Sequence, residues 1–558
     1  MTGGRTVDFR LGAIARAVEK RLAAWDAARF GERLWRGDPS LWVAGPATEI
    51  SDRLGWLRLP ETMARRLASF RAFADEIRAE GIRHVVLLGM GGSSLAPELY
   101  QKTLGNAPGF PALLVLDSTH PAAVAAVERT IDLRRTLFVV SSKSGTTIEP
   151  LSFFRYFWEK AGRLDGAPGR RFAAISDPGT PLQTLARERG FRRAFEALPD
   201  VGGRFSALTD FGLVPAALIG ADIGALLAAA RGAAAADGPG APADQSPGLR
   251  LGAALGELAL AGVDKLTLRT SPGLRSFPDW LEQLIAESTG KDGKGLVPVA
   301  GEPASNAALD APDRAFVFLA LAGDDAAALD AEAAAAERAG RPVIRIGLDG
   351  PAALGREIFH WELAVAAASS ALGVHPFNQP DVELAKDLAR KAMAAAPGSG
   401  AGSAPGGVES GAADALRDAV QGWLRGARPR DYICPQAYLA PDLGIAEELD
   451  GLRRILLTMA GRPVTLGRGP RFLHSTGQLH KGGPDEALVL QIVDRPAADL
   501  AVPETDYTFG RLVRAQADGD LAALRQRGRR ALRVDVGRDA AAGLARLSAA
   551  LDLSCPRG

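Results

Sequence analysis

The sequence TLFVVSSKSGTTIE at residues 136–149 joins an apolar run to a hydroxyl-rich turn and then to the start of a helix. The run 136–140 has the β-branched and aromatic composition of a buried strand. Parallel sheets bind ligands at the carboxyl ends of their strands, so a ligand is expected at this turn. Its donors are Ser142, Lys143, Ser144, Thr146 and Thr147. They predict a cradle for a phosphate group, and the alternative is a turn whose hydroxyls only cap the helix.

A related unit, HVVLLGMGGSSLAP, occupies residues 84–97. A helix that starts near Ser94 presents free N–H groups at its positive end, and Gly92, Ser93 and Ser94 are therefore candidate phosphate ligands. A dinucleotide fingerprint is the rival interpretation, with Asp117 after the next strand as the ribose ligand, and a purely structural turn is the third. Ser94 replaces the third glycine of that fingerprint. A dinucleotide domain also has no use for a second cradle, so phosphate binding is favoured.

Short β-rich runs alternate with helical patterns from residue 84 onward, which predicts parallel sheets wrapped by helices. The first series of expected strands is 84–88, 112–116, 136–140, 172–175 and 193–198. The second series is 315–321, 342–348, 463–466, 487–493 and 530–536. We expect each series to form one five-stranded, mostly parallel sheet. The predicted fold is α/β, with two αβα sandwich lobes and helical extensions.

The same patterns predict the division of the chain. Residues 1–80 are expected to be an N-terminal helical segment, 81–235 the first lobe, 236–310 a helical connection and 311–558 the second lobe. The stretch 397–411 is rich in glycine, alanine and proline and is expected to be a flexible surface loop within the second lobe.

Composition excludes several classes of protein. The 558 residues include 47% apolar residues, enough for large cores, while 66 Lys and Arg balance 65 Asp and Glu. This balance gives no reason to expect a nucleic-acid or membrane-surface partner. Two cysteines cannot form a disulfide framework, and no signal-peptide core or long uncharged apolar run is found. A cytoplasmic protein is expected.

The two loops resemble the phosphate loops of sugar isomerase (SIS) domains, and four further motifs resemble those of phosphoglucose isomerases. These motifs are VGGRFS at 201–206, QLIAESTGK at 283–291, PFNQPDVELAK at 376–386 and HSTGQLH at 474–480. The resemblance extends over about residues 35–536. It is greatest to the isomerase half of bacterial transaldolase–isomerase fusions, although the residues before the first loop are too few for a transaldolase barrel.

This resemblance implies an aldose–ketose isomerase that interconverts glucose 6-phosphate and fructose 6-phosphate through a cis-enediol, with no metal or organic cofactor. The catalytic residues that it implies are Glu287 as the base, Arg204, Lys386 and His474. The binding residues that it adds to the two loops are Gly203, Gln283 and Gln379.

The residue types suit these roles. Gln283 and Glu287 are four residues apart, so one helical face directs the amide toward phosphate and the carboxylate toward the sugar carbon. Arg204 keeps its charge and can stabilise an enediolate. Lys386 follows Gln379 by seven residues, again on one face. The alternatives are a solvated helix-end glutamate, a surface arginine and a surface lysine.

The histidine is the least direct assignment. His474 follows Lys386 here, whereas the order is reversed in the family, so we expect a permuted order within the second lobe. His375 is the alternative, and His474 with His480 could suggest a metal pair, but no acidic or cysteine ligand accompanies them. The resemblance also implies a homodimer in which the histidine of one subunit enters the site of the other.

Two other functions fit the motifs. One is an isomerase that also accepts mannose 6-phosphate, since C2 epimers differ in one hydroxyl position. The other is a non-catalytic sugar-phosphate sensor, which should keep both phosphate loops and lose the base or the arginine. The presence of Glu287, Arg204 and Lys386 favours an enzyme.

Overall fold

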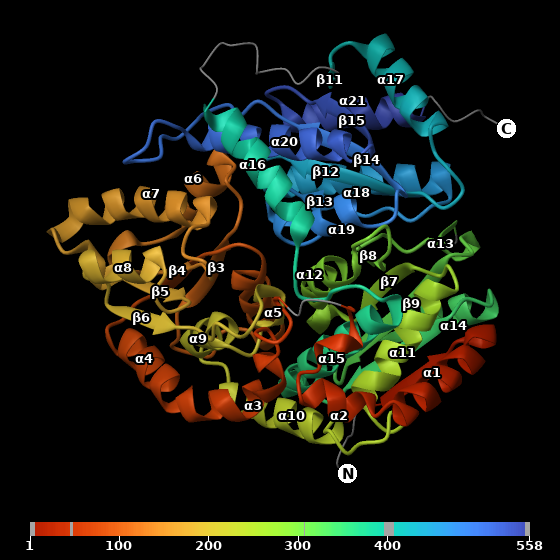
Figure 1. Cartoon of the computed structure of the whole chain (residues 1–558). Coiled ribbons are helices and arrows are strands. Elements are labelled where there is room, and N and C mark those ends of the chain that lie inside the picture. The colour runs from red at the N-terminus through yellow and green to blue at the C-terminus, as the bar shows by residue number, and fades with distance from the viewer. Residues whose placement is uncertain (1–5, 45–47, 306, 395–406, 553–558) are drawn as a thin grey trace.

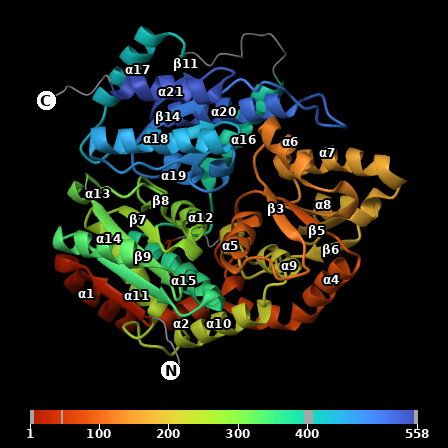
Figure 2. The same ribbon diagram turned by 180° about the vertical axis from the view of Figure 1, so that it is seen from behind.

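The described residues of the chain form three five-stranded sheets, each covered by helices. The computed structural model describes residues 6–44, 48–305, 307–394 and 407–552. In Figure 1 the sheets form three lobes around a common centre, the first at the left, the second at the lower right and the third at the top. Figure 2 shows the same arrangement from behind. The predicted α/β class with mostly parallel five-stranded sheets is confirmed, whereas the predicted number of two sheets is wrong.

The first lobe matches the first predicted series of strands. Its sheet has the order β3-β2-β4-β5-β6, and all neighbours are parallel. Its strands are β2 (His84–Leu88), β3 (Ala112–Leu116), β4 (Thr136–Ser141), β5 (Phe172–Ser176) and β6 (Arg193–Glu196). Its helices are α5 (Leu95–Leu104), α6 (Pro121–Thr130), α7 (Ile148–Asp165), α8 (Pro181–Glu188) and α9 (Asp210–Leu218). Continuous apolar runs mark β2 and β4 because helices cover both faces of a parallel sheet.

The second lobe has the order β1-β10-β9-β7-β8, with only β1 antiparallel to its neighbour among these strands. Its strands are β1 (Thr6–Arg10), β7 (Lys265–Thr270), β8 (Val297–Ala300), β9 (Arg314–Leu321) and β10 (Val343–Leu348). Its helices are α10 (Ile223–Ala236), α11 (Pro247–Leu260), α12 (Phe277–Thr289), α13 (Ala307–Asp310), α14 (Ala327–Arg338) and α15 (Leu354–Leu372). The N-terminal helices are α1 (Ala15–Ala27), α2 (Phe30–Trp35), α3 (Leu59–Thr62) and α4 (Leu67–Ala79).

The third lobe, described for residues 380–394 and 407–552, holds a sheet that the sequence analysis did not separate. Its order is β11-β15-β14-β12-β13, and all neighbours are parallel. The strands are β11 (Gly407–Glu409), β12 (Tyr432–Tyr438), β13 (Gly467–Arg468), β14 (Ala487–Val493) and β15 (Arg530–Asp535). The helices are α16 (Pro380–Ala394), α17 (Ala413–Arg425), α18 (Leu443–Ala460), α19 (Gly477–Gly482), α20 (Phe509–Gln526) and α21 (Ala540–Asp552).

These sheets correct several expectations. The second predicted series is split, because 315–321 and 342–348 belong to the second lobe and 487–493 and 530–536 to the third. The supposedly helical segments 1–80 and 236–310 contain β1, β7 and β8. Lys265 of β7 is fully buried and its ammonium lies 2.7 Å from Asp264, so a charged residue stands where an apolar one is expected. Part of the insert 397–411 forms β11, and residues 397–406 lie outside the described residues.

Apolar contacts join the third lobe to both others. Leu479 and Val489 pack with Ala286 and Val297 of the second lobe in one buried cluster. On the first lobe, the rings of Phe153 and Phe509 stack with centroids 5.9 Å apart. The helices α12 and α5 lie at the centre, where the lobes meet (Figure 1).

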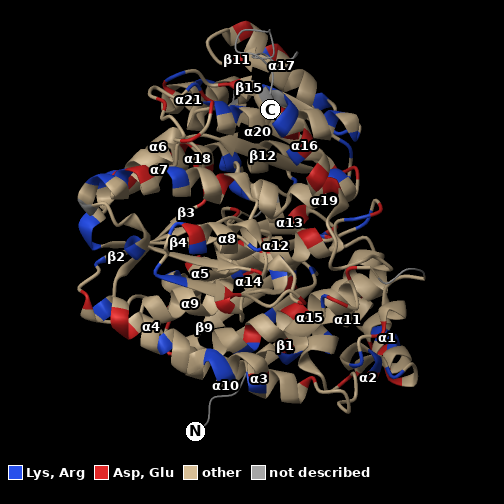
Figure 3. Ribbon diagram, turned by 60° about the vertical axis from the view of Figure 1, so that its left-hand side comes forward, with Lys and Arg blue, Asp and Glu red and all other residues tan. Residues whose placement is uncertain are grey.

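Lys and Arg positions and Asp and Glu positions are interspersed along the ribbon in Figure 3. Within the described residues, no helix is long and apolar enough to cross a membrane.

The buried Glu362 of α15 gives a prediction about stability. Neither of its carboxyl oxygens has a hydrogen-bond partner among the described residues, and burial raises its pKa well above the ordinary value. The folded state therefore holds a proton that the unfolded chain releases as pH rises above about 4.5, so stability should fall by about 1.4 kcal/mol per pH unit until the folded pKa is reached. Glu362→Gln should be more stable than wild type at neutral pH and equally stable near pH 4, as measured by urea unfolding. A gain that is independent of pH would contradict this assignment.

Candidate active site

Glu287 and Arg204 form a buried ion pair where the lobes meet. Glu287 lies in the last turn of α12, which has Pro278 in its first turn and ends at Gly290. Arg204 lies in the short helix η8 (Gly203–Phe205), which follows the first sheet. Its Nε is 3.0 Å from Oε2 of Glu287, and each side chain is only 4% exposed.

The remaining nitrogens of Arg204 hold the segment that contains Gln379. Nη1 donates to the carbonyl oxygens of Glu287 at 2.8 Å and Pro376 at 2.9 Å. Nη2 donates to Oε1 of Gln379 at 3.0 Å and to the carbonyl of Asn378 at 3.2 Å. The planar guanidinium thus joins the carboxylate to residues 376–379, which a lysine could not do with one ammonium group.

The surroundings make Glu287 a basic carboxylate. Burial raises its pKa, while Arg204 and, more weakly, His474 act in the opposite direction. A carboxylate that is shielded from water accepts a proton more readily than an exposed one, and the paired cation favours its charged form.

His474 reaches the site from the third lobe of the same chain. It ends the short helix η11 (Arg471–His474), and its Nε2 lies 2.9 Å from Oε1 of Glu149 in the first turn of α7. The same carboxylate oxygen accepts a hydrogen bond of 2.7 Å from Gln516 of α20. Burial by itself would raise the pKa of Glu149, but the charge and hydrogen bond of His474 hold it below the ordinary value. The carboxylate is therefore ionised and orients the imidazole.

Gln283 connects this histidine to the base. Its Nε2 donates 2.7 Å to the carbonyl oxygen of His474, and its Oε1 is buried without a described partner. The amide was expected to contact phosphate, and in this structure its nitrogen is committed to the histidine segment. Gln283, which holds the backbone of the permuted histidine, lies one helical turn before Glu287 on α12, and His474 belongs to the third lobe rather than to a second one.

The two predicted phosphate loops lie at the carboxyl ends of β2 and β4. Ser142 donates to Thr147 at 3.0 Å, and the hydroxyls of Ser144 and Thr146 are 3.0 Å apart and exposed. Ser93 and Ser94 are buried in the other loop. Gly92 approaches Gly203 so closely that a Cβ at residue 92 would lie 2.0 Å from the carbonyl oxygen of Gly203.

Two predicted cations have partners of their own. The ammonium of Lys143 lies 2.6 Å from Asp177, so its contribution to the cradle stays a prediction. Lys386 lies on α16, 42% exposed, and its ammonium is 2.8 Å from Glu383. Its charge is nonetheless close enough to lower the pKa values of Glu149 and Glu287.

The other candidate histidines already have partners within the chain. His375 accepts hydrogen bonds at Nδ1 from the backbone N–H groups of Phe377 and Asn378, and its Nε2 lies 3.0 Å from the carbonyl of Thr48. His480 faces the core, 3.3 Å from the sulfur of Cys434, and burial lowers its pKa to about 3. His474 and His480 thus do not converge. In the described part of the chain, no group of three or more His, Cys, Asp or Glu side chains could hold a metal ion.

The sequence analysis missed Glu149, Gln516 and Lys291. Glu149 ends the first quoted motif, where an acidic residue in a first helical turn is usually explained by the helix dipole. Lys291 donates to the carbonyl of Ser288 at 3.1 Å, and burial, with the charge of Arg204, holds its pKa well below the ordinary value. No local feature of the sequence indicates a role for Gln516, because its partner Glu149 lies 367 residues away.

Comparisons with known proteins show which family the chain resembles. The sequence profile described as phosphoglucose isomerase matches residues 62–297, a range that includes both predicted phosphate loops, Arg204 and Glu287. The glucose-6-phosphate isomerase of Rubrobacter xylanophilus is 29% identical over 398 residues, 63% of this chain and 91% of that protein. The glucose-6-phosphate isomerase of Clostridium novyi is 30% identical over 390 residues, 60% of this chain and 85% of that protein.

Solved structures share the fold. A hypothetical protein from Thermus thermophilus aligns over its whole length and 70% of this chain, with a TM-score of 0.60 and 28% identity. A glucose-6-phosphate isomerase from Chlamydia trachomatis aligns over 88% of its length and 70% of this chain, with a TM-score of 0.54 and 21% identity.

Proposed function

This chain belongs to the phosphoglucose isomerase family, and we propose that Glu287, Arg204 and His474 carry out its reaction. The chain is a glucose-6-phosphate isomerase, an aldose–ketose isomerase that acts on sugar phosphates. The buried pair of Glu287 and Arg204, 3.0 Å apart and adjoining His474, is the observation that best supports these roles. The predicted homodimer and the cytoplasmic location stay predictions.

The reaction moves one proton between C1 and C2 of the open-chain sugar. Glu287 removes the proton from one carbon and returns it to the other, and the cis-enediol is the intermediate. Arg204 stabilises the negative charge that develops on the enediolate oxygen, because a guanidinium fixed in a dry site needs no reorganisation. Lys386 adds positive charge nearby.

Ring opening needs a group that gives and takes a proton near neutral pH, which an imidazole does. We assign this step to His474, held by the carboxylate of Glu149 at 2.9 Å. The phosphate group is bound by the hydroxyls of residues 142–147 and the N–H groups of residues 92–94, with Gln379 at the side of Arg204.

The test is turnover of fructose 6-phosphate to glucose 6-phosphate by the purified chain, coupled to glucose-6-phosphate oxidation and run with a chelator. Turnover should survive the chelator, since the proton moves between carbon and carboxylate. No turnover, or turnover that the chelator abolishes, would contradict the proposal. Mannose 6-phosphate in the same assay distinguishes a broader isomerase.

The phosphate cradle gives a second prediction. Ser144→Ala with Thr147→Ala should raise KM for the phosphorylated sugar far more than it lowers kcat, because phosphate is held in both the ground state and the transition state. Steady-state kinetics measure the two effects. Ser152→Ala is a matched control, because this hydroxyl donates to the backbone of α7 outside the cradle. An unchanged KM would place the phosphate elsewhere.

A further inference from the structure

The third lobe binds the first lobe at three points of one loop, which follows β3. The guanidinium of Arg471 lies 3.1 Å from Asp117, and Asp494 lies 3.1 Å from His120. Between these two contacts, the hydroxyl of Thr119 donates 2.6 Å to Gln516. The side chains of Thr119 and His120 are buried, so these contacts belong to the interior of the chain.

The third lobe is bound to the second lobe beside the catalytic helix. Gln478 of α19 donates 3.1 Å to the carbonyl of Gly290, which directly follows α12. The N–H of Gly293 donates 2.9 Å to the carbonyl of Gly482. At another point the N–H of Val464 donates 2.8 Å to the fully buried carboxylate of Glu302. Two of these contacts thus hold α19 against the second lobe, and the third holds the segment at Val464.

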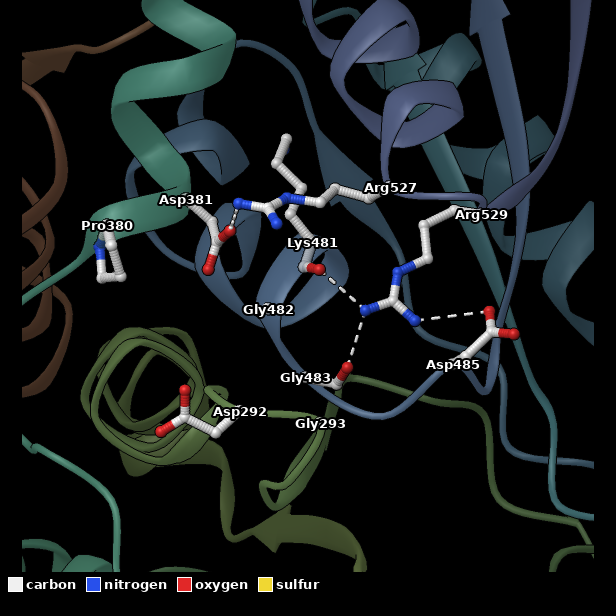
Figure 4. Close-up of a pocket in the computed structure, with 10 residues that line it drawn as sticks. All are labelled: Asp292, Gly293, Pro380, Asp381, Lys481, Gly482, Gly483, Asp485, Arg527 and Arg529. Carbon is white, nitrogen blue, oxygen red and sulfur yellow. Dashed lines mark hydrogen bonds and ion pairs between the residues drawn. The ribbon is translucent and has the colours of Figure 1, made fainter.

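A pocket of 490 Å³ lies at this junction, between the end of α12, the start of α16 and the end of α19. Figure 4 shows Arg529 reaching across it to the carbonyl oxygens of Lys481 and Gly483, each 2.7 Å away. Lys481 is paired with Asp520, and Arg527 with Asp381. Because the cations are paired within the chain, we interpret this region as a junction that holds α19 and not as an anion site.

Arg471 binds carboxylates of both other lobes, three residues before His474 in the same short helix. It pairs with Glu98 of α5, with Asp117 and, at 3.9 Å, with Asp279 of α12. Burial raises the pKa of Asp117, and Arg471 opposes this rise. Removing the arginine would leave these carboxylates without their cation, which is strongly unfavourable. The segment that carries His474 is therefore fixed by charge to both lobes.

The backbone of His474 also fits closely against the first phosphate loop. Gly91 has a positive φ of 55°, and a Cβ at this residue would lie 2.8 Å from the carbonyl oxygen of His474 and 2.9 Å from Nε2 of Gln283. The three lobes thus meet at one point, with no room for a side chain between them.

We propose that the third lobe completes the active site of its own chain, with Arg471 as the residue that positions His474. A single chain then carries the base, the arginine and the ring-opening histidine, and it needs no partner subunit for activity. This inference rests on the proposed function of His474.

The first test uses chains with two different affinity tags, expressed together. In a shared site, Glu287→Gln and His474→Ala chains would complement each other, and a random mixture of dimers would regain about one quarter of wild-type activity. A site within one chain predicts no recovery in any species that carries both tags. If no such species forms, wild type should sediment as a monomer and keep its specific activity on dilution. Recovered activity, or activity that disappears as dimers dissociate, would overturn the proposal.

The second test concerns Arg471. Arg471→Lys should lower kcat at least tenfold and leave the binding of an acyclic sugar phosphate such as glucitol 6-phosphate unchanged, because that ligand needs no ring opening. Arg471→Lys with His474→Ala should be no slower than His474→Ala alone, since both changes act through one imidazole. Arg453→Lys is the matched control. Arg453 joins the third lobe to the second at the carbonyls of Ala300 and Gly301 and not through the short helix that carries His474, and its replacement should leave kcat within about twofold of wild type.

If the effects of Arg471→Lys and His474→Ala multiply, or if Arg453→Lys lowers kcat equally, Arg471 has only a structural role and the positioning claim fails. Wild-type turnover is measured first in every experiment. Its absence would contradict the proposed function itself, whereas turnover with complementation would contradict only the site within one chain.

Discussion

Glu287→Gln should lower kcat by about a thousandfold or more, because a positioned general base contributes about 10²–10⁴-fold. The amide keeps the shape of the side chain and a partner for Arg204, but it cannot accept a proton from carbon. Exchange of the C2 proton with deuterated solvent, followed by NMR, measures this step directly. Binding of glucitol 6-phosphate should be retained.

A control for this variant lies on the same helix. Burial, together with the charge of Asp279, raises the pKa of Glu282 to about 8, so this side chain is protonated near neutral pH. Glu282→Gln replaces a neutral acid with a neutral amide and should leave kcat within a few-fold of wild type. If Glu287→Gln keeps more than about a tenth of wild-type kcat, another group is the base.

Two variants of Arg204 should separate the effect of its positive charge from the effect of its planar shape. Arg204→Lys should lower kcat about a hundredfold, because one ammonium cannot bind Glu287, the carbonyls of residues 376–378 and Gln379 together. Arg204→Gln should lower kcat about a thousandfold, because the charge that stabilises the enediolate is also lost.

The pH dependence of these two variants should differ. Burial raises the pKa of Glu287 and Arg204 opposes it, so a neutral residue at 204 lets that pKa rise further. Because Glu287 must be ionised to act as a base, the acidic limb of the kcat/KM profile should move to higher pH in Arg204→Gln and stay near its wild-type position in Arg204→Lys. Equal profiles in both variants would show that Arg204 does not control the ionisation of Glu287.

Much of the first lobe could be predicted from sequence. The strands β2 and β4 are buried on both faces, so their residues form continuous apolar runs, and the predicted phosphate loops follow them directly. Each of these patterns extends over about ten residues, and residue spacing predicts structure over that range.

The second and third sheets could not be divided correctly for a physical reason. Strand β7 contains Lys265, and its charge is compensated by Asp264 and by Glu486, which lies 221 residues away. Strand β12 contains Pro435 and the buried Gln436, which depart from the pattern of an apolar strand. A charged or polar residue fits inside a strand only when a distant partner satisfies it, and the local sequence does not show that partner.

The sequence by itself determined the chemistry of this protein. Its motifs contain the residues proposed here as base, arginine, lysine, histidine and two phosphate loops, because each of these predictions depends on residue type and local spacing. Only the tertiary structure decided how they meet. Arg204 and Glu287 pair across 83 residues, and His474 reaches Glu149 across 325. That meeting depends on how three lobes dock through buried charges such as Arg471, and the free energy of docking comes from contacts between distant segments.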